Sequence, residues 1–244
     1  MHFNAFKTLS DDVFTLVYNN QTPEDYGVFC YDYPVISSAE KRRETKNIGG
    51  AMGQLVEEEG PIAYNNITIK QTFSVLHKKF MLKVTEIKDW LRNSGTLQFS
   101  DTTDRFYEVL YIEHGDIERE IRKYGRFSVT FHCFPYVFME HGQQEAAIST
   151  VKQNPYNIAM PVYTITGNGD CTIAVNGKSL IATVGQTLTI DTRRQIAYKT
   201  RNGGYLNTSI KGKYSNLYLP HGAVTITATN GFNVKIQPNW GWIA

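Results

Sequence analysis

The sequence predicts a mainly β protein of two domains, the first carrying one helix and a long extended arm. Its 244 residues are 41% hydrophobic and 13% aromatic, which is enough apolar surface for a sizeable core. Many of these residues are Tyr, Phe, Val and Ile, which fit a pleated sheet better than a helix. Beyond residue 160 the chain changes to short strands between tight-turn signals such as Asn176-Gly177 and Asn230-Gly231. This pattern of short strands and tight turns is typical of a β-sandwich.

These changes along the chain predict its domain boundaries. Residues 1–137 are expected to form an N-terminal domain that is barrel-like or sandwich-like and ends after the strand that runs into Phe134-Pro135. Residues 138–158 are mostly polar and are expected to be a linker or a crossing segment. Residues 159–244 are expected to form the C-terminal β-sandwich.

The arm is predicted at residues 37–66, which are charged, contain several glycines and offer little apolar surface. A segment of this length without core residues is unusual in a compact monomer. It is expected either to be disordered or to leave the body of the domain and meet a neighbouring molecule.

The centre of the first domain follows from residue periodicity. Residues 65–76 predict a strand in which an apparent change of phase between Ile69 and Phe73 suggests a bulge. Val84, Ile87 and Trp90 share one face of a short helix, for which Thr85 is a candidate N-cap and Gly95 a candidate C′ residue. Residues 125–133 alternate cleanly and predict a half-buried strand.

No catalytic, cofactor or metal site is expected. The three cysteines match no zinc pattern, and the six histidines show none of the spacings typical of a metal site. Asp101 and Asp104 lie in a Ser/Asp/Thr turn, where a role in bending the backbone is favoured over one in hydrolysis with Glu108. The formal charge of +2 and the mixed signs of the charged clusters argue against a nucleic-acid binder. No signal peptide or membrane span is recognised, so synthesis in a cytosol is expected.

Two tryptophans near residue 240 suggest a possible binding surface. Trp240 and Trp242 are spaced by two residues, which would place them on one face of a strand. Aromatic rings on an exposed face can stack on sugars, whereas on the inner face they fill the core. Both interpretations are open, with the core favoured for any single aromatic residue of this domain.

The ordered set of features resembles the distal tail proteins of bacteriophages with long non-contractile tails (siphoviruses). The resemblance covers nearly the whole chain. It rests on segments at residues 46–50, 64–67, 87–91, 97–101, 104–107, 125–131 and 133–136 in the first domain, and at residues 190–191, 217–222 and 236–240 in the second. Where that family often has Pro-Gly-Arg in the loop, this chain has Ile48-Gly49-Gly50.

The resemblance implies a homohexameric ring of first domains, each carrying a galectin-like β-sandwich. Such a ring joins the tail tube protein to the tail-tip protein, carries receptor-binding or baseplate proteins, and lets DNA pass as cargo. It implies a virion location at the tail tip, with no cofactor, no membrane partner and no enzymatic activity. The extended arm would reach the next subunit through the loop that contains Ile48, Gly49, Gly50 and Gly53.

Two functions of different classes are therefore carried forward. The first is a structural hub of a phage tail. The alternative is a carbohydrate-binding adhesin that contacts the host cell wall through the C-terminal β-sandwich, with Trp240 and Trp242 as the candidate residues.

Overall fold

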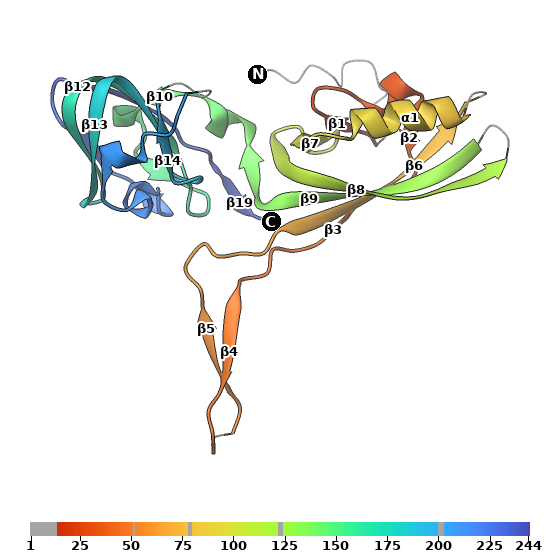
Figure 1. Cartoon of the computed structure of the whole chain (residues 1–244), viewed down its shortest axis with the longest axis horizontal. Helices are drawn as coiled ribbons and strands as arrows, with labels where there is room; N and C mark the ends of the chain where they lie inside the picture. Colours follow the sequence, from red (N-terminus) through yellow and green to blue (C-terminus); the bar gives the residue numbers. More distant parts are fainter. Residues whose placement is uncertain (1–13, 51, 78–79, 122–123, 200–202) are drawn as a thin grey trace. The chain divides into compact units, whose positions relative to one another are not determined.

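A computed structural model describes residues 14–50, 52–77, 80–121, 124–199 and 203–244. The chain divides into two compact units (Figure 1). The first unit contains residues up to Val137 together with Ile243–Ala244, and the second unit is Phe138–Trp242. The chain therefore leaves the first unit once and returns to it once. The mainly β fold expected from the sequence is confirmed.

The first unit is built on one antiparallel sheet. Its strands follow the order β1-β7-β8-β9-β6-β2, with β3 pairing with β6 and β19 with β9. The bounds of these strands are β1 (Leu16–Tyr18), β2 (Val28–Cys30), β3 (Val35–Ile36), β6 (Ile67–Leu76), β7 (Gly95–Phe99), β8 (Arg105–Ile121), β9 (Tyr124–Met139) and β19 (Gly241–Ile243). A short 3-10 helix, η1 (Pro23–Tyr26), connects β1 to β2.

An uninterrupted ladder joins β6 to β9. All ten residues of β6 pair in register, from Ile67 opposite Cys133 to Leu76 opposite Tyr124. The bulge expected in this strand is therefore wrong. The gap in the apolar pattern is Gln71, which is buried and whose amide donates to the Asp32 carbonyl oxygen at 2.8 Å. A polar side chain occupies an inward position here, with its amide nitrogen also donating to the Thr72 carbonyl oxygen at 2.9 Å, so the phase of the strand never changes.

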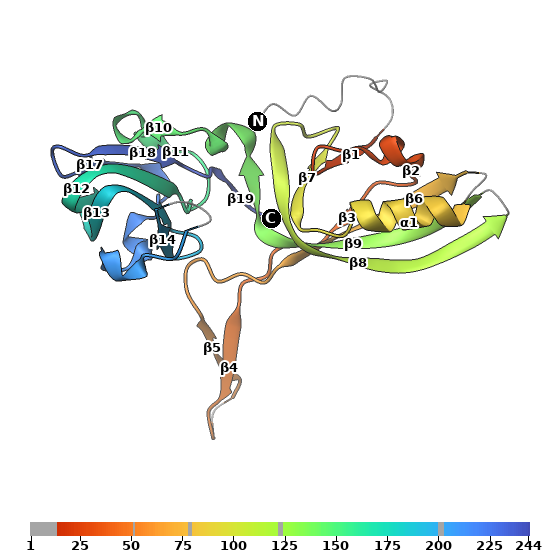
Figure 2. The ribbon, with the colours of Figure 1, turned by 45° about the horizontal axis from the view of Figure 1, so that its top comes forward.

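One helix, α1 (Phe80–Trp90), lies across one face of this sheet (Figure 2). It buries Phe80, Val84, Ile87 and Trp90, a stripe with the spacing of an amphipathic helix. The Trp90 ring stacks on Tyr26 with centroids 4.9 Å apart, and it meets the Tyr18 and Phe73 rings edge-on. Trp90 is thus the core anchor that its periodicity predicted.

The expected ends of this helix are wrong. The helix begins five residues before Thr85, whose hydroxyl instead donates to the Met81 carbonyl oxygen within the helix. Gly95 starts β7 and does not cap the helix. A Cβ at Gly95 would lie 1.7 Å from the Asn19 amide oxygen, which accepts a hydrogen bond from the Thr96 amide. Glycine is needed at this position for a close approach between two strands.

The second unit contains a larger sheet and a small one. The larger has the order β10-β18-β12-β13-β14, with β15 pairing with β13 and β17 with β12, and the small sheet is β11-β16. The bounds are β10 (Ala146–Ala147), β11 (Gln153–Asn154), β12 (Val162–Val175), β13 (Lys178–Asp191), β14 (Ile196–Tyr198), β15 (Ile210–Lys211), β16 (Gly222–Ala223), β17 (Ile226–Ala228) and β18 (Asn233–Gln237). Four 3-10 helices complete it: η2 (Glu140–Gln143), η3 (Ile148–Thr150), η4 (Asn207–Ser209) and η5 (Tyr214–Leu217).

Residues 138–158, expected to be a linker or crossing segment, contribute to the interior of the second unit. Met139 and Val151 belong to its hydrophobic core. Asn154 is fully buried, and its side-chain amide donates to the carbonyl oxygens of Asn157 and Leu219 at 2.8 and 3.0 Å. A buried amide with two acceptors fixes the segment in place.

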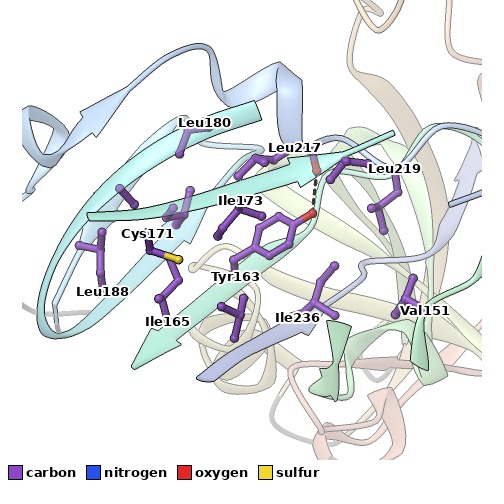
Figure 3. Close-up of a cluster of buried hydrophobic side chains, with 14 of the residues drawn as sticks. Val151, Tyr163, Ile165, Cys171, Ile173, Leu180, Leu188, Leu217, Leu219 and Ile236 are labelled. Carbon is purple, nitrogen blue, oxygen red and sulfur yellow. Dashed lines mark hydrogen bonds between the residues drawn. The ribbon is translucent and has the colours of Figure 1, made fainter. Parts of the chain in front are cut away.

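The core of the second unit lies against β12 and β13 (Figure 3). These two strands form a hairpin whose fourteen paired positions run from Val162 opposite Asp191 to Val175 opposite Lys178. Inward residues alternate with outward ones along both strands, as a half-buried sheet requires. At the centre, the buried Tyr163 hydroxyl donates to the Leu217 carbonyl oxygen at 2.9 Å.

The Tyr163 hydrogen bond leads to a first prediction. Tyr163→Phe leaves the Leu217 carbonyl oxygen buried without its donor, so the free energy of unfolding of the second unit should fall by about 1–3 kcal/mol. Denaturant titration measures the change. Tyr205→Phe is the matched control, since Tyr205 is largely exposed. Equal stability of the two variants would contradict the role of the bond.

The buried thiol of Cys133 leads to a prediction about pH. Burial raises its pKa from 9.0 to about 12, so the thiol ionises at lower pH in the unfolded chain than in the folded one. Its contribution to stability is complete below about pH 9 and is lost as the pH rises toward 12. The free energy of unfolding should therefore decrease above pH 9, and less steeply in Cys133→Ala. Identical slopes for the two proteins in denaturant titrations at several pH values would contradict this.

Candidate interaction surfaces

A two-stranded hairpin, called the arm below, occupies most of the segment for which an extended arm was expected. Its strands are β4 (Arg43–Asn47) and β5 (Gln54–Glu58), and among the described strands they pair only with each other (Figure 1). Every residue of both strands is exposed. An isolated hairpin of this kind is only marginally stable in water. Contact with another surface would therefore stabilise the arm.

Charged side chains on the arm compensate one another. Residues 41–59 contain four basic and four acidic residues, so their formal charges cancel. The ion pairs are Lys41–Glu58, Arg42–Glu59 at 3.2 Å, Arg43–Glu58 at 4.0 Å, Lys46–Glu44 at 3.7 Å and Lys46–Glu57 at 2.6 Å. Exposed pairs contribute only about 0–1 kcal/mol each. Their main effect is to leave the arm without net charge.

The loop residues expected to make contacts lie at the tip of the arm. Ile48 has an exposed side chain, and the three glycines lie beside it between the two strands. Gly50 and Gly53 have φ angles of +79° and +85°, so the turn needs residues without a Cβ at these positions. The exposed apolar side chains of the arm are Ile48, Met52, Leu55 and Val56.

The two tryptophans differ in exposure. Trp240 is 9% exposed and belongs to the core of the second unit, where Gly142 packs so closely that a Cβ there would lie 2.5 Å from the Trp240 backbone nitrogen. Trp242 is 42% exposed and meets the ring of Tyr156 edge-on, with centroids 5.2 Å apart. The Trp240 ring also neighbours Tyr156, with centroids 6.3 Å apart, and the placement of the two rings on one face stays a prediction.

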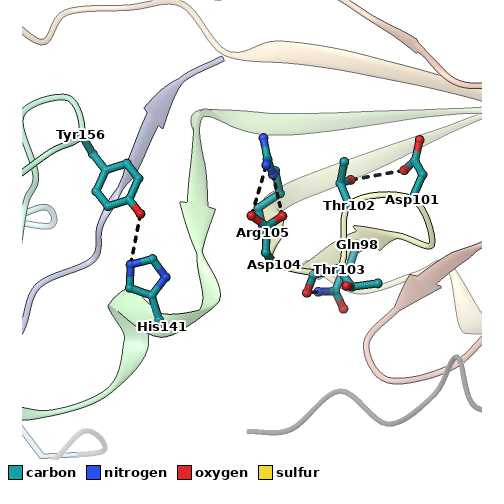
Figure 4. Close-up of polar contacts among 8 residues, drawn as sticks. All are labelled: Gln98, Asp101, Thr102, Thr103, Asp104, Arg105, His141 and Tyr156. Atoms are coloured by element: carbon teal, nitrogen blue, oxygen red, sulfur yellow. Dashed lines mark hydrogen bonds and ion pairs between the residues drawn. The ribbon is translucent and has the colours of Figure 1, made fainter.

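The polar residues considered for hydrolysis have structural partners (Figure 4). Asp104 pairs with Arg105 at 2.8 Å, and Asp101 accepts a hydrogen bond from Thr102 in the turn between β7 and β8. The Gln98 amide donates to the Thr103 carbonyl oxygen at 2.6 Å and closes the same turn. These contacts shape the backbone, as proposed for the Asp residues from the sequence.

Histidine rings in the described residues contact neighbouring groups. The His132 ring stacks on Tyr111 with centroids 4.2 Å apart, and its Nε2 atom is 3.1 Å from the Glu113 carboxylate. Nε2 of His141 is within hydrogen-bonding distance, 3.2 Å, of the Tyr156 hydroxyl (Figure 4). Across the described ranges, no cluster of three or more His, Cys, Asp or Glu side chains could hold a metal ion. No helix within those ranges is long and apolar enough to cross a membrane.

A further exposed apolar surface was not identified from the sequence. It lies along β2, β3 and their connection, at one edge of the sheet of the first unit, and comprises Phe29, Tyr31, Tyr33, Val35 and Ile36. An unpaired sheet edge with exposed apolar side chains is a site at which another chain can add. The sequence contains two signals of this surface. One is the run of aromatic residues before Pro34, and the other is Pro34 itself, which favours a position at the edge of a sheet.

The fold belongs to a class found in a phage tail hub. A solved structure, the Dit (gp 19.1) protein of SPP1, matches this chain with a TM-score of 0.61. That protein is described as a paradigm of the hub adsorption apparatus in phages that infect Gram-positive bacteria. The alignment covers 92% of this chain and 98% of the SPP1 protein, at 14% sequence identity.

The resemblance to distal tail proteins is thereby confirmed at the level of the fold, along nearly the whole chain. No protein-family model and no curated protein matches the sequence. At this identity, the likeness is one of fold.

Proposed function

We propose that this protein is a structural hub of a phage tail and not an enzyme. Its first unit would form a homohexameric ring at the distal end of the tail tube. The ring would join the tube protein to the tail-tip protein, carry receptor-binding or baseplate proteins, and leave a channel through which DNA passes. The protein would be made in the host cytoplasm and reside in the virion. The observation that carries this proposal is the fold shared with the SPP1 hub protein over 92% of the chain.

The proposed domains follow from this function. Residues 1–137 would be the ring-forming domain, and the β-sandwich at residues 159–244, galectin-like in type, would lie outside the ring. Residues 138–158 would lead from one to the other while packing into the core of the second unit. Because the same surface repeats in every copy, contacts from one subunit to the next close into a ring when the rotation between them closes.

The arm has the properties that such a contact needs. Its charges cancel within it, so burial against a neighbour leaves no net charge without a partner. Its exposed apolar side chains would gain free energy on burial. We therefore assign contacts with the next subunit to the tip, with Ile48 as the apolar contact and Gly49, Gly50 and Gly53 as the residues that form the turn.

Replacing one apolar side chain of the arm tests the ring. Val56→Glu should weaken subunit association by at least roughly tenfold, because a buried carboxylate would replace an apolar contact. Light scattering over a range of concentrations measures the oligomer. Met81→Glu is the matched control, since Met81 is also exposed but lies on α1.

The control should assemble as the wild-type protein does. Wild-type protein that stays monomeric at high concentration, and also with tube protein added, would contradict the hub proposal. A Val56→Glu variant that assembles normally would contradict the contact through the arm.

A second candidate function is carbohydrate binding by the second unit, as an adhesin for the host cell wall. It is favoured by the exposed Trp242 beside the half-buried Tyr156, since exposed aromatic rings can stack on sugar rings. Trp240 contributes no exposed ring to such a surface.

Cell-wall pull-down with the full chain tests this second function. Trp242→Ala should abolish wall binding, while Tyr205→Ala, which removes another exposed ring of the same unit, should leave it unchanged. Absence of wall binding by the wild-type protein would eliminate the adhesin function, and equal losses in both variants would eliminate Trp242 as its site.

A further inference from the structure

Two Asn-Gly pairs form turns in the second unit, and their asparagines have different environments. Asn176-Gly177 joins β12 to β13, and Asn230-Gly231 lies between β17 and β18. In both pairs the following glycine has no side chain to shield its backbone nitrogen. The local sequence therefore gives both asparagines the same intrinsic reactivity toward the following glycine nitrogen. The fold determines which of the two reacts.

The reaction is the deamidation of asparagine, which needs only water. The backbone nitrogen of the glycine attacks the side-chain carbonyl carbon of the asparagine. A C–N bond forms, the side-chain nitrogen leaves as ammonia, and a five-membered cyclic imide results. Water then opens the imide at either carbonyl group and yields aspartate or isoaspartate, in which the backbone runs through the side chain. The attack requires the asparagine side chain to rotate toward the next residue.

Hydrogen bonds hold Asn176 away from this geometry. Its side-chain amide donates to the Ala223 carbonyl oxygen at 3.0 Å, and its side-chain oxygen accepts from the Thr225 amide at 2.8 Å. Its own backbone amide donates to the Thr225 carbonyl oxygen at 3.0 Å. The φ angles of +48° at Asn176 and +83° at Gly177 are those of a tight two-residue hairpin turn. Both side-chain bonds must break before the imide can form.

Asn230 lies in an exposed turn without such restraints. Asn230 and Gly231 are both exposed, and in the described part of the chain no hydrogen bond holds the Asn230 side chain. The turn is anchored one residue earlier, where the Thr229 amide donates to the Thr172 carbonyl oxygen at 3.0 Å. The flanking strands β17 and β18 pair with different parts of β12. The Asn230 side chain is thus free to approach the glycine nitrogen.

We infer that Asn230 is a site of spontaneous deamidation in the folded protein, whereas Asn176 is protected by its hydrogen bonds. The conversion adds one negative charge to the turn after β17. Isoaspartate also adds one methylene group to the backbone that leads into β18. The inference concerns the second unit alone and does not depend on the proposed function.

Peptide mapping by mass spectrometry tests the inference on the full chain. Folded protein is kept for several days in warm, mildly alkaline buffer, and the mass gain of an amide-to-acid conversion is quantified at each site. Conversion at Asn230 should exceed that at Asn176 by at least roughly tenfold, because two hydrogen bonds must open at Asn176. Two further pairs are mapped separately: Asn168-Gly169, which lies within β12, and Asn202-Gly203, which begins outside the described residues.

The same incubation in denaturant is the control for intrinsic reactivity. Without the fold, Asn176 and Asn230 should convert at similar rates, since a glycine follows both. In folded Asn230→Gln the signal at residue 230 should disappear, because glutamine would need a six-membered ring, while conversion at Asn176 stays unchanged. Equal conversion of the two asparagines in the folded wild type, or conversion at Asn230 only in denaturant, would overturn the inference.

Discussion

The unbroken ladder between β6 and β9 is the constraint on which the first unit depends. Every second residue of β6 faces the core, and its partners there, such as Phe131 opposite Ile69 and Phe127 opposite Phe73, are apolar. A shift of one residue would turn all of these side chains to the outer face. The arm joins the sheet just before β6, where the Asn65 amide donates to the Glu40 carbonyl oxygen at 2.8 Å. The register of the ladder therefore also sets the position of the base of the arm.

The periodicity of apolar residues along the chain correctly predicted those strands and helices in which one face is buried. The alternation in residues 125–133 and the spacing of Trp90 on its helix both reflect burial on one face, which the sequence records directly. Gln71 and Gly95 did not follow from the sequence, because each depends on a partner far along the chain. The Gln71 side-chain amide donates to the Asp32 carbonyl oxygen, and Gly95 makes room for the Asn19 side chain.

The candidate surfaces were predicted in part for the same reason. Low apolar content identified residues 37–66 as a segment outside the core, but polarity alone could not distinguish disorder from the hairpin found there. The pairing of Glu58 with Lys41 and Arg43 across the arm depends on the strand register, which follows from the turn at the tip. Likewise, the different exposed fractions of Trp240 and Trp242 depend on packing by residues far along the chain, such as Gly142 against Trp240.

The second unit is one continuous segment inserted into the first, because the chain leaves the first unit after Val137 and returns to it at Ile243. In the second unit, the Met139 amide donates to the Trp240 carbonyl oxygen at 2.8 Å, so its entry and exit points are neighbours. In the first unit, the Ala244 amide donates to the Pro135 carbonyl oxygen at 3.4 Å, so the ends of the interruption are neighbours there as well. Insertion is tolerated where the ends of a module lie close together. The second unit, Phe138–Trp242, is therefore a module that can be exchanged at these two junctions while the first unit keeps its own core.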